Sequence, residues 1–145
     1  MIALLQRVTR AEVMVAGSSC GAIGTGLLAL IGVRPDDDSV KMARLLERIV
    51  TQRLFSDHAG RMNRCLAEVG GGLLLVPQFT LAADTRKGNR PGFSGAAEPI
   101  LAQRLFEELV ARARASCEPV ACGQFGADMQ VSLVNDGPVT IWLES

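Results

Sequence analysis

The sequence predicts a single α+β domain over residues 1–145, with a largely antiparallel sheet that curls toward a barrel and two main helices packed on one side. Three observations predict it. Apolar and polar residues alternate at both ends of the chain, as in strands with one buried face. Two segments between these ends have apolar residues at helical spacing. The chain has 145 residues, 48% of them hydrophobic and 21% charged, which fits one globular domain.

The N-terminal part predicts a meander of three strands. Apolar residues alternate along positions 2–15, which indicates a long, bent strand. Turn residues at 17–19 and 24–26 flank a short return strand over 20–23, and the run 27–33 is typical of a buried strand. The glycines of this region do not form a nucleotide-binding loop, because a strand-like run follows them where such a loop requires a helix.

Three consecutive aspartates, Asp36 to Asp38, precede the first predicted helix. Carboxylates at this place accept hydrogen bonds from free helical N–H groups and meet the positive end of the helix dipole, so we favour capping over metal binding. The apolar residues that follow share one face of a helix of about four turns. They are Val40, Ala43, Leu46, Ile49 and Val50.

The rest of the chain contains one more helix among strands. Pro99 suits the first turn of a helix, and leucines recur after it every four residues. Near the C-terminus the period returns to two, and Gly137-Pro138 there reads as a tight turn that joins two strands. The predicted elements are a short strand at 53–55, a loop at 57–63, a buried strand at 73–76, a helix at 98–115 and strands at 129–133 and 139–143.

Charge and composition exclude several classes. Fifteen Lys and Arg balance fifteen Asp and Glu, so the protein does not coat a polyanion through bulk charge. No apolar run approaches the roughly 18 residues of a membrane span, and the N-terminus lacks the signal-peptide layout, so we expect a cytoplasmic protein without membrane contact. The four cysteines have no metal-ligand spacing and His58 is the only histidine. We therefore expect reduced thiols, no metal and no cofactor.

The end of the predicted strand at 73–76 carries candidate chemistry. Gln78, Phe79 and Thr80 follow a buried strand that ends in Pro77. Backbone N–H groups there could form an oxyanion pocket, or Thr80 could be a nucleophile. Alternatively, Gln78 and Thr80 only satisfy backbone groups at the strand end.

The loop over 84–93 carries three cations, Arg86, Lys87 and Arg90, in five residues. These cations suit contacts with phosphate groups, and a solvated loop explains them equally well.

Three motifs together are far more specific than their parts. They are the start Met-Ile-Ala-Leu-Leu-Gln-Arg-Val, the segment Pro-Gln-Phe-Thr-Leu-Ala-Ala-Asp at 77–84, and Asp-Met-Gln-Val-Ser-Leu-Val-Asn-Asp-Gly-Pro-Val-Thr at 128–140. The chain closely resembles the D-aminoacyl-tRNA deacylase family, also called D-Tyr-tRNA deacylases, from end to end. The family usually has serine where this chain has Pro77. Phe79 and the intact Gly137-Pro138 favour the D-specific branch over the related animal-type deacylase.

The resemblance implies a hydrolase that cleaves the ester of D-aminoacyl-tRNA, and of glycyl-tRNA for alanine, at the tRNA 3' end. It implies a homodimer with the active site at the interface, where Gly137-Pro138 of one subunit, with a cis peptide bond, enters the pocket of the other. An L side chain would collide with this element, whereas a D side chain would point to open space. The resemblance also implies catalysis assisted by the 2'-hydroxyl of the terminal ribose acting with a water molecule. The sequence agrees, since the motifs offer little for a protein general base.

The resemblance also implies residue roles. Gln78, Phe79 and Thr80 would line the ester site beside Pro77, and Arg7 would brace the Gly137-Pro138 turn. Phe125 and Met129 would form an apolar wall for the terminal adenine. Arg86, Lys87 and Arg90 would contact tRNA phosphates.

Two other functions stay open at this point. Pro77 and the missing general base also fit a catalytically silent dimeric module that binds RNA ends or protein. A Thr80-dependent esterase is the third reading.

Overall fold

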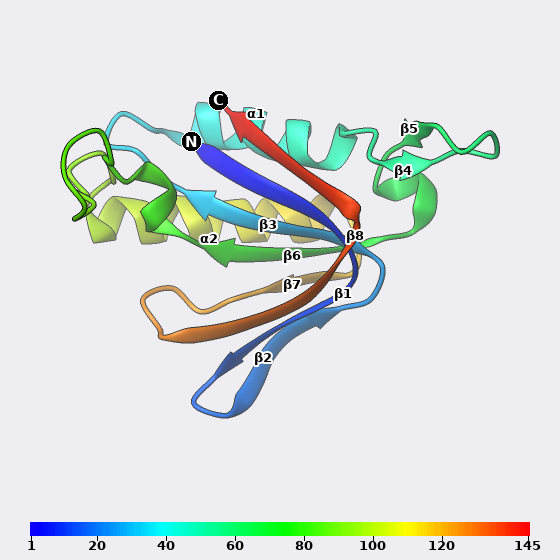
Figure 1. The fold of residues 1–145 in the computed structure, drawn as a ribbon, viewed down its shortest axis with the longest axis horizontal. Coiled ribbons are helices and arrows are strands. Elements are labelled where there is room, and N and C mark those ends of the chain that lie inside the picture. Colours follow the sequence, from blue (N-terminus) through cyan, green and yellow to red (C-terminus); the bar gives the residue numbers. More distant parts are fainter.

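The main sheet is built around the first strand, which has neighbours on both sides along its length (Figure 1). The computed structural model describes all 145 residues. Strand β1 (Ile2–Val15) pairs antiparallel with β2 (Ser18–Ile23), β3 (Gly26–Gly32) and β8 (Met129–Glu144). Strand β3 pairs parallel with β6 (Gly72–Pro77), and β6 pairs parallel with β7 (Val120–Cys122). The periodicity of the sequence did not indicate these two parallel pairings.

The sheet curls until its far strands meet. A Cβ atom added at Gly21 of β2 would lie 2.8 Å from the carbonyl oxygen of Cys122 in β7, so the backbones of these two strands are in close contact. The sheet is mixed and nearly closed, and the predicted α+β fold with a curled sheet and two main helices is confirmed.

Both main helices cover the same face of the sheet (Figure 1). They are α1 (Ser39–Thr51) and α2 (Pro99–Ser116), close to the predicted bounds. Neither is long and apolar enough to cross a bilayer. The smaller elements are β4 (Phe55–Ser56), β5 (Met62–Arg64) and two short 3₁₀ helices, η1 (Ala67–Val69) and η2 (Phe79–Ala82).

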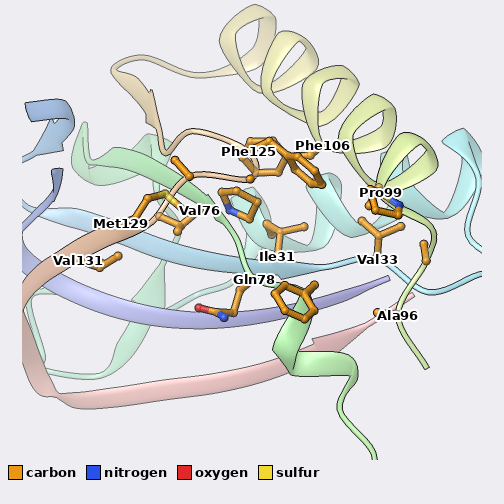
Figure 2. A pocket seen from close by; sticks show the side chains of 16 residues that line it. Ile31, Val33, Val76, Gln78, Ala96, Pro99, Phe106, Phe125, Met129 and Val131 are labelled. Carbon is orange, nitrogen blue, oxygen red and sulfur yellow. The ribbon is translucent and has the colours of Figure 1, made fainter. Parts of the chain in front are cut away.

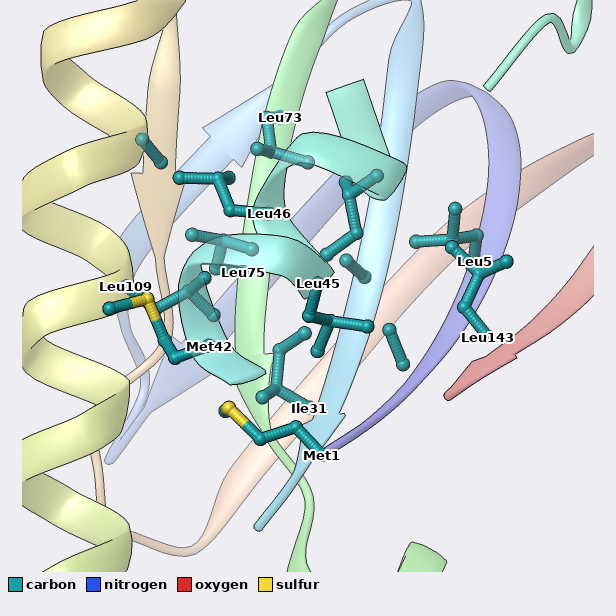
Figure 3. Close-up of a cluster of buried hydrophobic side chains, with 14 of the residues drawn as sticks. Met1, Leu5, Ile31, Met42, Leu45, Leu46, Leu73, Leu75, Leu109 and Leu143 are labelled. Carbon is teal, nitrogen blue, oxygen red and sulfur yellow. The ribbon is translucent and has the colours of Figure 1, made fainter. Parts of the chain in front are cut away.

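The main core fills the space between the helices and the sheet (Figure 3). Leu45 of α1 and Leu109 of α2 meet Leu75 of β6 there, all fully buried. A second cluster lies on the opposite face of the sheet and contains Leu74 and Val76. Because β6 is buried on both faces, its sequence is a continuous apolar run instead of an alternation.

The three aspartates before α1 make different contacts. The Asp38 carboxylate accepts hydrogen bonds from the backbone N–H groups of Val40 (3.0 Å) and Lys41 (2.8 Å), which confirms the predicted cap. Asp37 is buried and pairs with the α-ammonium group of Met1 at 2.6 Å. Asp36 pairs with Lys41 at 2.7 Å, and this hydrogen bond holds the pKa of Asp36 below its ordinary value.

The segment around Gly137-Pro138 is a bulge within one strand, so the predicted tight turn between two strands is wrong. Gln6 of β1 pairs with Thr140 and Val8 pairs with Asn135, which leaves residues 136–139 opposite Arg7 alone. Both halves of β8 pair with β1 in the same direction, so the chain cannot reverse and the extra residues loop out of the ladder. The peptide bond between Gly137 and Pro138 is cis.

Candidate active site

A pocket of about 480 Å³ opens between α2, the ends of β3 and β6, and the start of β8 (Figure 2). Most of its lining is apolar. It is lined by Ile31, Val33, Val76, Pro77, Gln78, Phe79, Ala96, Ala97, Pro99, Ala102, Phe106, Phe125, Gly126, Ala127, Met129 and Val131. Five predicted site residues, Pro77, Gln78, Phe79, Phe125 and Met129, are thus brought together from distant parts of the sequence.

The end of β6 places Gln78 and Phe79 at the pocket. The backbone N–H of Gln78 donates to the carbonyl of Ile31 at 2.7 Å, which keeps the chain beside β3 until η2 begins. The Gln78 side chain then donates through Nε2 to the hydroxyl of Thr80 at 2.5 Å. Thr80 does not line the pocket itself, and its contact with the site is the hydrogen bond that positions the amide of Gln78.

The opposite wall depends on a missing side chain at Gly123. A Cβ atom there would lie 2.8 Å from the sulfur of Met129 and 3.4 Å from Cδ of Pro77. Glycine therefore lets the Met129 and Pro77 side chains pack close to the backbone of residue 123. Figure 2 shows Phe125 on the α2 side of the pocket with Phe106, across from Gln78.

No titratable side chain lines this pocket, and Gln78 is its one polar side chain. His58 lies elsewhere, in the exposed connection between β4 and β5. None of the residues that line the pocket therefore offers a titratable side chain as a proton acceptor.

Gly137 and Pro138 lie outside this pocket and are exposed. Their bulge is held by Arg7, whose Nε donates to the carbonyl of Asp136 at 3.1 Å and lies 3.1 Å from its carboxylate. Nη1 of Arg7 donates to the carbonyl of Leu54 at 2.5 Å. Gly137 has φ +134°, and a Cβ atom there would lie 3.2 Å from Nη2 of Arg7, so this position requires glycine.

The cationic loop is separate from the apolar pocket. It is closed by two backbone hydrogen bonds between Asp84 and Gly92, of 2.7 and 2.9 Å. Arg86 binds the carboxylate of Asp84 through two nitrogens, at 2.9 and 2.7 Å, and holds its pKa well below its usual range. Lys87 and Arg90 form no ion pair or side-chain hydrogen bond, so these two cations face solvent alone.

Sequence reasoning missed several residues of this region. Phe93 packs edge-on against Phe79, with ring centroids 5.0 Å apart and an angle of 63° between the planes. Ala96, Ala97 and Phe106 line the pocket. An aromatic residue inside a cationic loop was a usable signal for Phe93, whereas small apolar residues carry no such signal.

Comparisons with known proteins agree over the full chain. The family model described as D-Tyr-tRNA(Tyr) deacylase matches residues 4–144. A D-aminoacyl-tRNA deacylase of Thioalkalivibrio sulfidiphilus is 65% identical over 144 residues, which covers 99% of this chain and 97% of that protein. A D-aminoacyl-tRNA deacylase of Alkalilimnicola ehrlichii is 60% identical over 145 residues, covering 100% and 97%.

Solved structures share the fold. One described as a c-Myc DNA unwinding element binding protein has a TM-score of 0.95 at 37% identity and covers 100% of this chain and 99% of its own. A probable eukaryotic D-amino acid tRNA deacylase has a TM-score of 0.86 at 14% identity, over 99% of this chain and 98% of its own, a likeness of fold alone. With a matching family model and relatives of this similarity, the chain belongs to the D-Tyr-tRNA(Tyr) deacylase family.

Proposed function

We propose that this protein hydrolyses the ester of D-aminoacyl-tRNA and of glycyl-tRNA for alanine, and spares L-aminoacyl esters. In this proposal residues 1–145 form a single deacylase domain, and the protein is a cytoplasmic homodimer. The proposal rests on an apolar pocket that has one polar side chain and no titratable group. Outside this pocket the chain exposes the Gly137-Pro138 bulge, which Arg7 holds in place. Membership in the deacylase family supports the same reaction.

In this proposal the pocket holds the terminal adenosine and its ester. Phe125 and Met129 pack against the adenine, and Gln78 orients the ester carbonyl. Phe79 and Thr80 lie in the first turn of η2, and the first N–H groups of a helix have no acceptor within it. These N–H groups suit the charge that develops on the carbonyl oxygen.

The Gly137-Pro138 bulge supplies the choice between enantiomers. In the dimer the bulge of one subunit enters the pocket of the other, where an L side chain would collide with it. A D side chain points away, and glycine, which has no side chain, passes the same test. Arg7 fixes the bulge, because it donates to the carbonyl of Asp136 from a nearly buried side chain.

The 2'-hydroxyl of the terminal ribose assists the reaction with a water molecule. The absence of a titratable lining side chain supports this assignment. The ester bond between the amino acid and the ribose breaks, water supplies the hydroxyl of the freed carboxyl group, and the ribose oxygen takes up a proton. Positioning of reactants is worth about 7–11 kcal/mol in the best intramolecular cases, so a reactive ester needs little further help.

A mixing experiment tests the composite site. Gln78→Ala damages the pocket, and Gly137→Val displaces the bulge because its side chain would meet Arg7 and Val139. Each variant alone is expected to be inactive. After subunit exchange a mixed dimer has one intact pocket facing one intact bulge, so an equal mixture should regain roughly a quarter of wild-type activity.

The matched control mixes Gln78→Ala with Ala96→Trp, since both damage the pocket and no mixed dimer contains an intact site. Recovery in this control, or no recovery in the first mixture despite proven exchange of subunits, would contradict a site shared between subunits.

The Thr80-dependent esterase makes a different prediction. The hydroxyl of Thr80 has one hydrogen bond, from the amide of Gln78, and no partner that could remove its proton. We therefore expect Thr80→Val to keep measurable turnover and a substrate with a 2'-deoxy terminal ribose to be hydrolysed slowly. Loss of turnover in Thr80→Val, with rapid cleavage of the 2'-deoxy substrate, would favour the esterase.

A further inference from the structure

Three hollows adjoin one another along one segment of the chain. Ala96 and Ala97 line the apolar pocket, and Gly95 and Ser94 line the next hollow together with residues 82–86. Ser94 also lines a third hollow, which has no hydrophobic lining residue. Its other lining residues are Asp84, Arg86, Lys87, Arg90 and Gly92. The surface beside residues 94–97 therefore runs from the apolar pocket to the cationic loop.

An exposed aromatic pair stands on this surface. Phe79 is 55% exposed and Phe93 is 42% exposed, with their rings 5.0 Å apart. Two adjacent exposed aromatic rings beside a pocket form a candidate binding surface, because their faces can stack on a planar ligand.

The chain around Phe93 is held against the pocket. Gly92 is paired with Asp84 through their backbones, and the N–H of Ala97 donates to the carbonyl of Val33 at 2.9 Å. A Cβ atom at Gly95 would lie 2.7 Å from the carbonyl oxygen of Ala82, so the segment packs directly on the end of η2. Phe93 is thus fixed on both sides, which lowers the entropy that a ligand must overcome.

The three cations beyond the aromatic pair differ in whether they have an ion-pair partner. Arg86 is occupied by Asp84, whereas Lys87 and Arg90 have no partner in the structure. Aromatic rings followed by unpaired cations are the combination that binds single-stranded nucleic acid, because bases stack on the rings and phosphates meet the charges.

We propose that the penultimate base of the tRNA 3' end stacks on Phe93 and that the phosphates of this end meet Lys87 and Arg90, while Arg86 shapes the loop. The inference rests on the proposed function, which puts the terminal adenosine in the apolar pocket. It adds a base-binding residue, Phe93, and a direction, since the RNA strand leaves the pocket over Phe79 and Phe93 toward the cationic loop.

Binding of short unacylated RNAs tests this path. Adenosine, the dinucleotide CpA and the trinucleotide CpCpA are titrated against the full chain. Stacking of one base corresponds to about a tenfold gain in affinity, so CpA should bind wild type about tenfold more tightly than adenosine. Phe93→Ala should lose this gain and Phe93→Tyr should keep it. Ile100→Ala is the control, because Ile100 is 86% exposed and lines none of the three hollows, and it should behave as wild type.

The salt dependence of CpCpA binding separates the cations. Each phosphate contact to a single strand contributes about 0.7 to the slope of log affinity against log salt, so the double variant Lys87→Gln, Arg90→Gln should lower the slope by about 1.4. Thermal unfolding of every variant confirms that the fold is retained.

Hydrolysis of D-Tyr-tRNA by wild type, measured in parallel, keeps the two proposals apart. In one outcome wild type hydrolyses the ester while CpA binds the protein no better than adenosine, and in another Phe93→Ala keeps the tighter binding of CpA. Either result would contradict the proposed RNA path over Phe93 and leave the proposed deacylase function intact. If wild type shows the gain but never hydrolyses the ester, the path stands for an RNA-end binding protein and the proposed function is wrong.

Discussion

Replacing Arg7 by methionine removes the brace of the Gly-Pro bulge while keeping an apolar stem of similar length. The Arg7 side chain is only 12% exposed. It donates to two backbone carbonyls, of Asp136 at 3.1 Å and of Leu54 at 2.5 Å. Methionine offers neither hydrogen bond, so both carbonyls lose their charged partner.

The two hydrogen bonds set the size of the effect. A hydrogen bond from a charged donor is worth about 1.5–3 kcal/mol, so the pair amounts to about 3–6 kcal/mol. The ion pair with the half-exposed Asp136 carboxylate adds less than about 1 kcal/mol. Water can solvate the exposed bulge in the variant and offset part of the loss, so we expect unfolding free energy to fall by about 3 kcal/mol. A bulge displaced by about 1 Å should lower kcat/KM for D-Tyr-tRNA roughly 100-fold.

Urea unfolding measures the stability, and deacylation of D- and L-Tyr-tRNA measures the activity and its enantiomer ratio. Arg10→Met is the matched control. Arg10 lies on the same strand, is exposed and has no hydrogen-bond or ion-pair partner through its side chain, so its loss should change stability by less than about 0.5 kcal/mol. An Arg7→Met variant with the stability, rate and enantiomer ratio of wild type would refute the role of Arg7.

Three further changes probe the fold. Gly26→Ala would put a Cβ atom 1.9 Å from the carbonyl oxygen of Gly72, so urea unfolding should show a loss of about 3 kcal/mol or more. Gly24→Ala, where the new atom meets nothing within 4 Å, should show little change; equal effects would contradict the close approach of β3 and β6. Asp37→Asn leaves the Met1 ammonium buried without its counter-charge, and urea unfolding at neutral pH should show a loss of about 3–5 kcal/mol. A loss no larger than that of Asp36→Asn would count against this pair. The Ser39 hydroxyl donates to Glu108 at 2.7 Å and holds the pKa of that carboxyl below 4.5, so Ser39→Ala should raise it in an NMR titration. A Glu108 pKa that is lower in the folded protein stabilises the fold above pH 4.5, and this stabilisation is lost as the pH falls through the folded pKa. The unfolding free energy of Ser39→Ala should therefore depend less on pH in acid than that of wild type. A Glu108 pKa that does not move in the variant would exclude the Ser39 contact as the cause of the shift.

The fold class and both helices could be predicted because the pattern of burial is local. Leu46 and Ile49 of the predicted apolar face are buried at the helical period, and Asp38 is a residue type that caps helices. Val40, predicted on the same face, is 76% exposed, and Met42 and Leu45 complete the buried face instead. The direction of strand pairing could not be predicted, because an apolar run such as 73–76 reports burial on two faces and not the direction of its neighbours.

The bulge at Gly137-Pro138 shows a second limit. Glycine followed by proline is typical of a turn between strands, and on local grounds a hairpin was the natural prediction. The outcome depends on β1, which pairs with both halves of β8 and keeps the chain running in one direction. Pairing over such sequence distances is not visible in a local pattern.

The candidate site divides in the same way. Gln78 and Phe79 could be found because they interrupt an apolar strand end, and the pocket contains both. Phe93 was missed although an aromatic residue inside a cationic loop was a usable signal, and its place beside the ring of Phe79 is visible only in the structure. The sequence pointed to Thr80 as clearly as to Gln78. In the structure, however, the Thr80 hydroxyl accepts a hydrogen bond from the Gln78 amide.

Side-by-side deacylation of D-Tyr-tRNA and L-Tyr-tRNA by wild-type protein, with a chelator present, tests the central claim most directly. The account predicts rapid loss of the D ester alone, with Pro77 in place of the serine usual in the family. Persistence of both esters would contradict the deacylase itself and favour a silent RNA-end binding module. Cleavage of both esters would contradict the exclusion of L substrates by Gly137-Pro138.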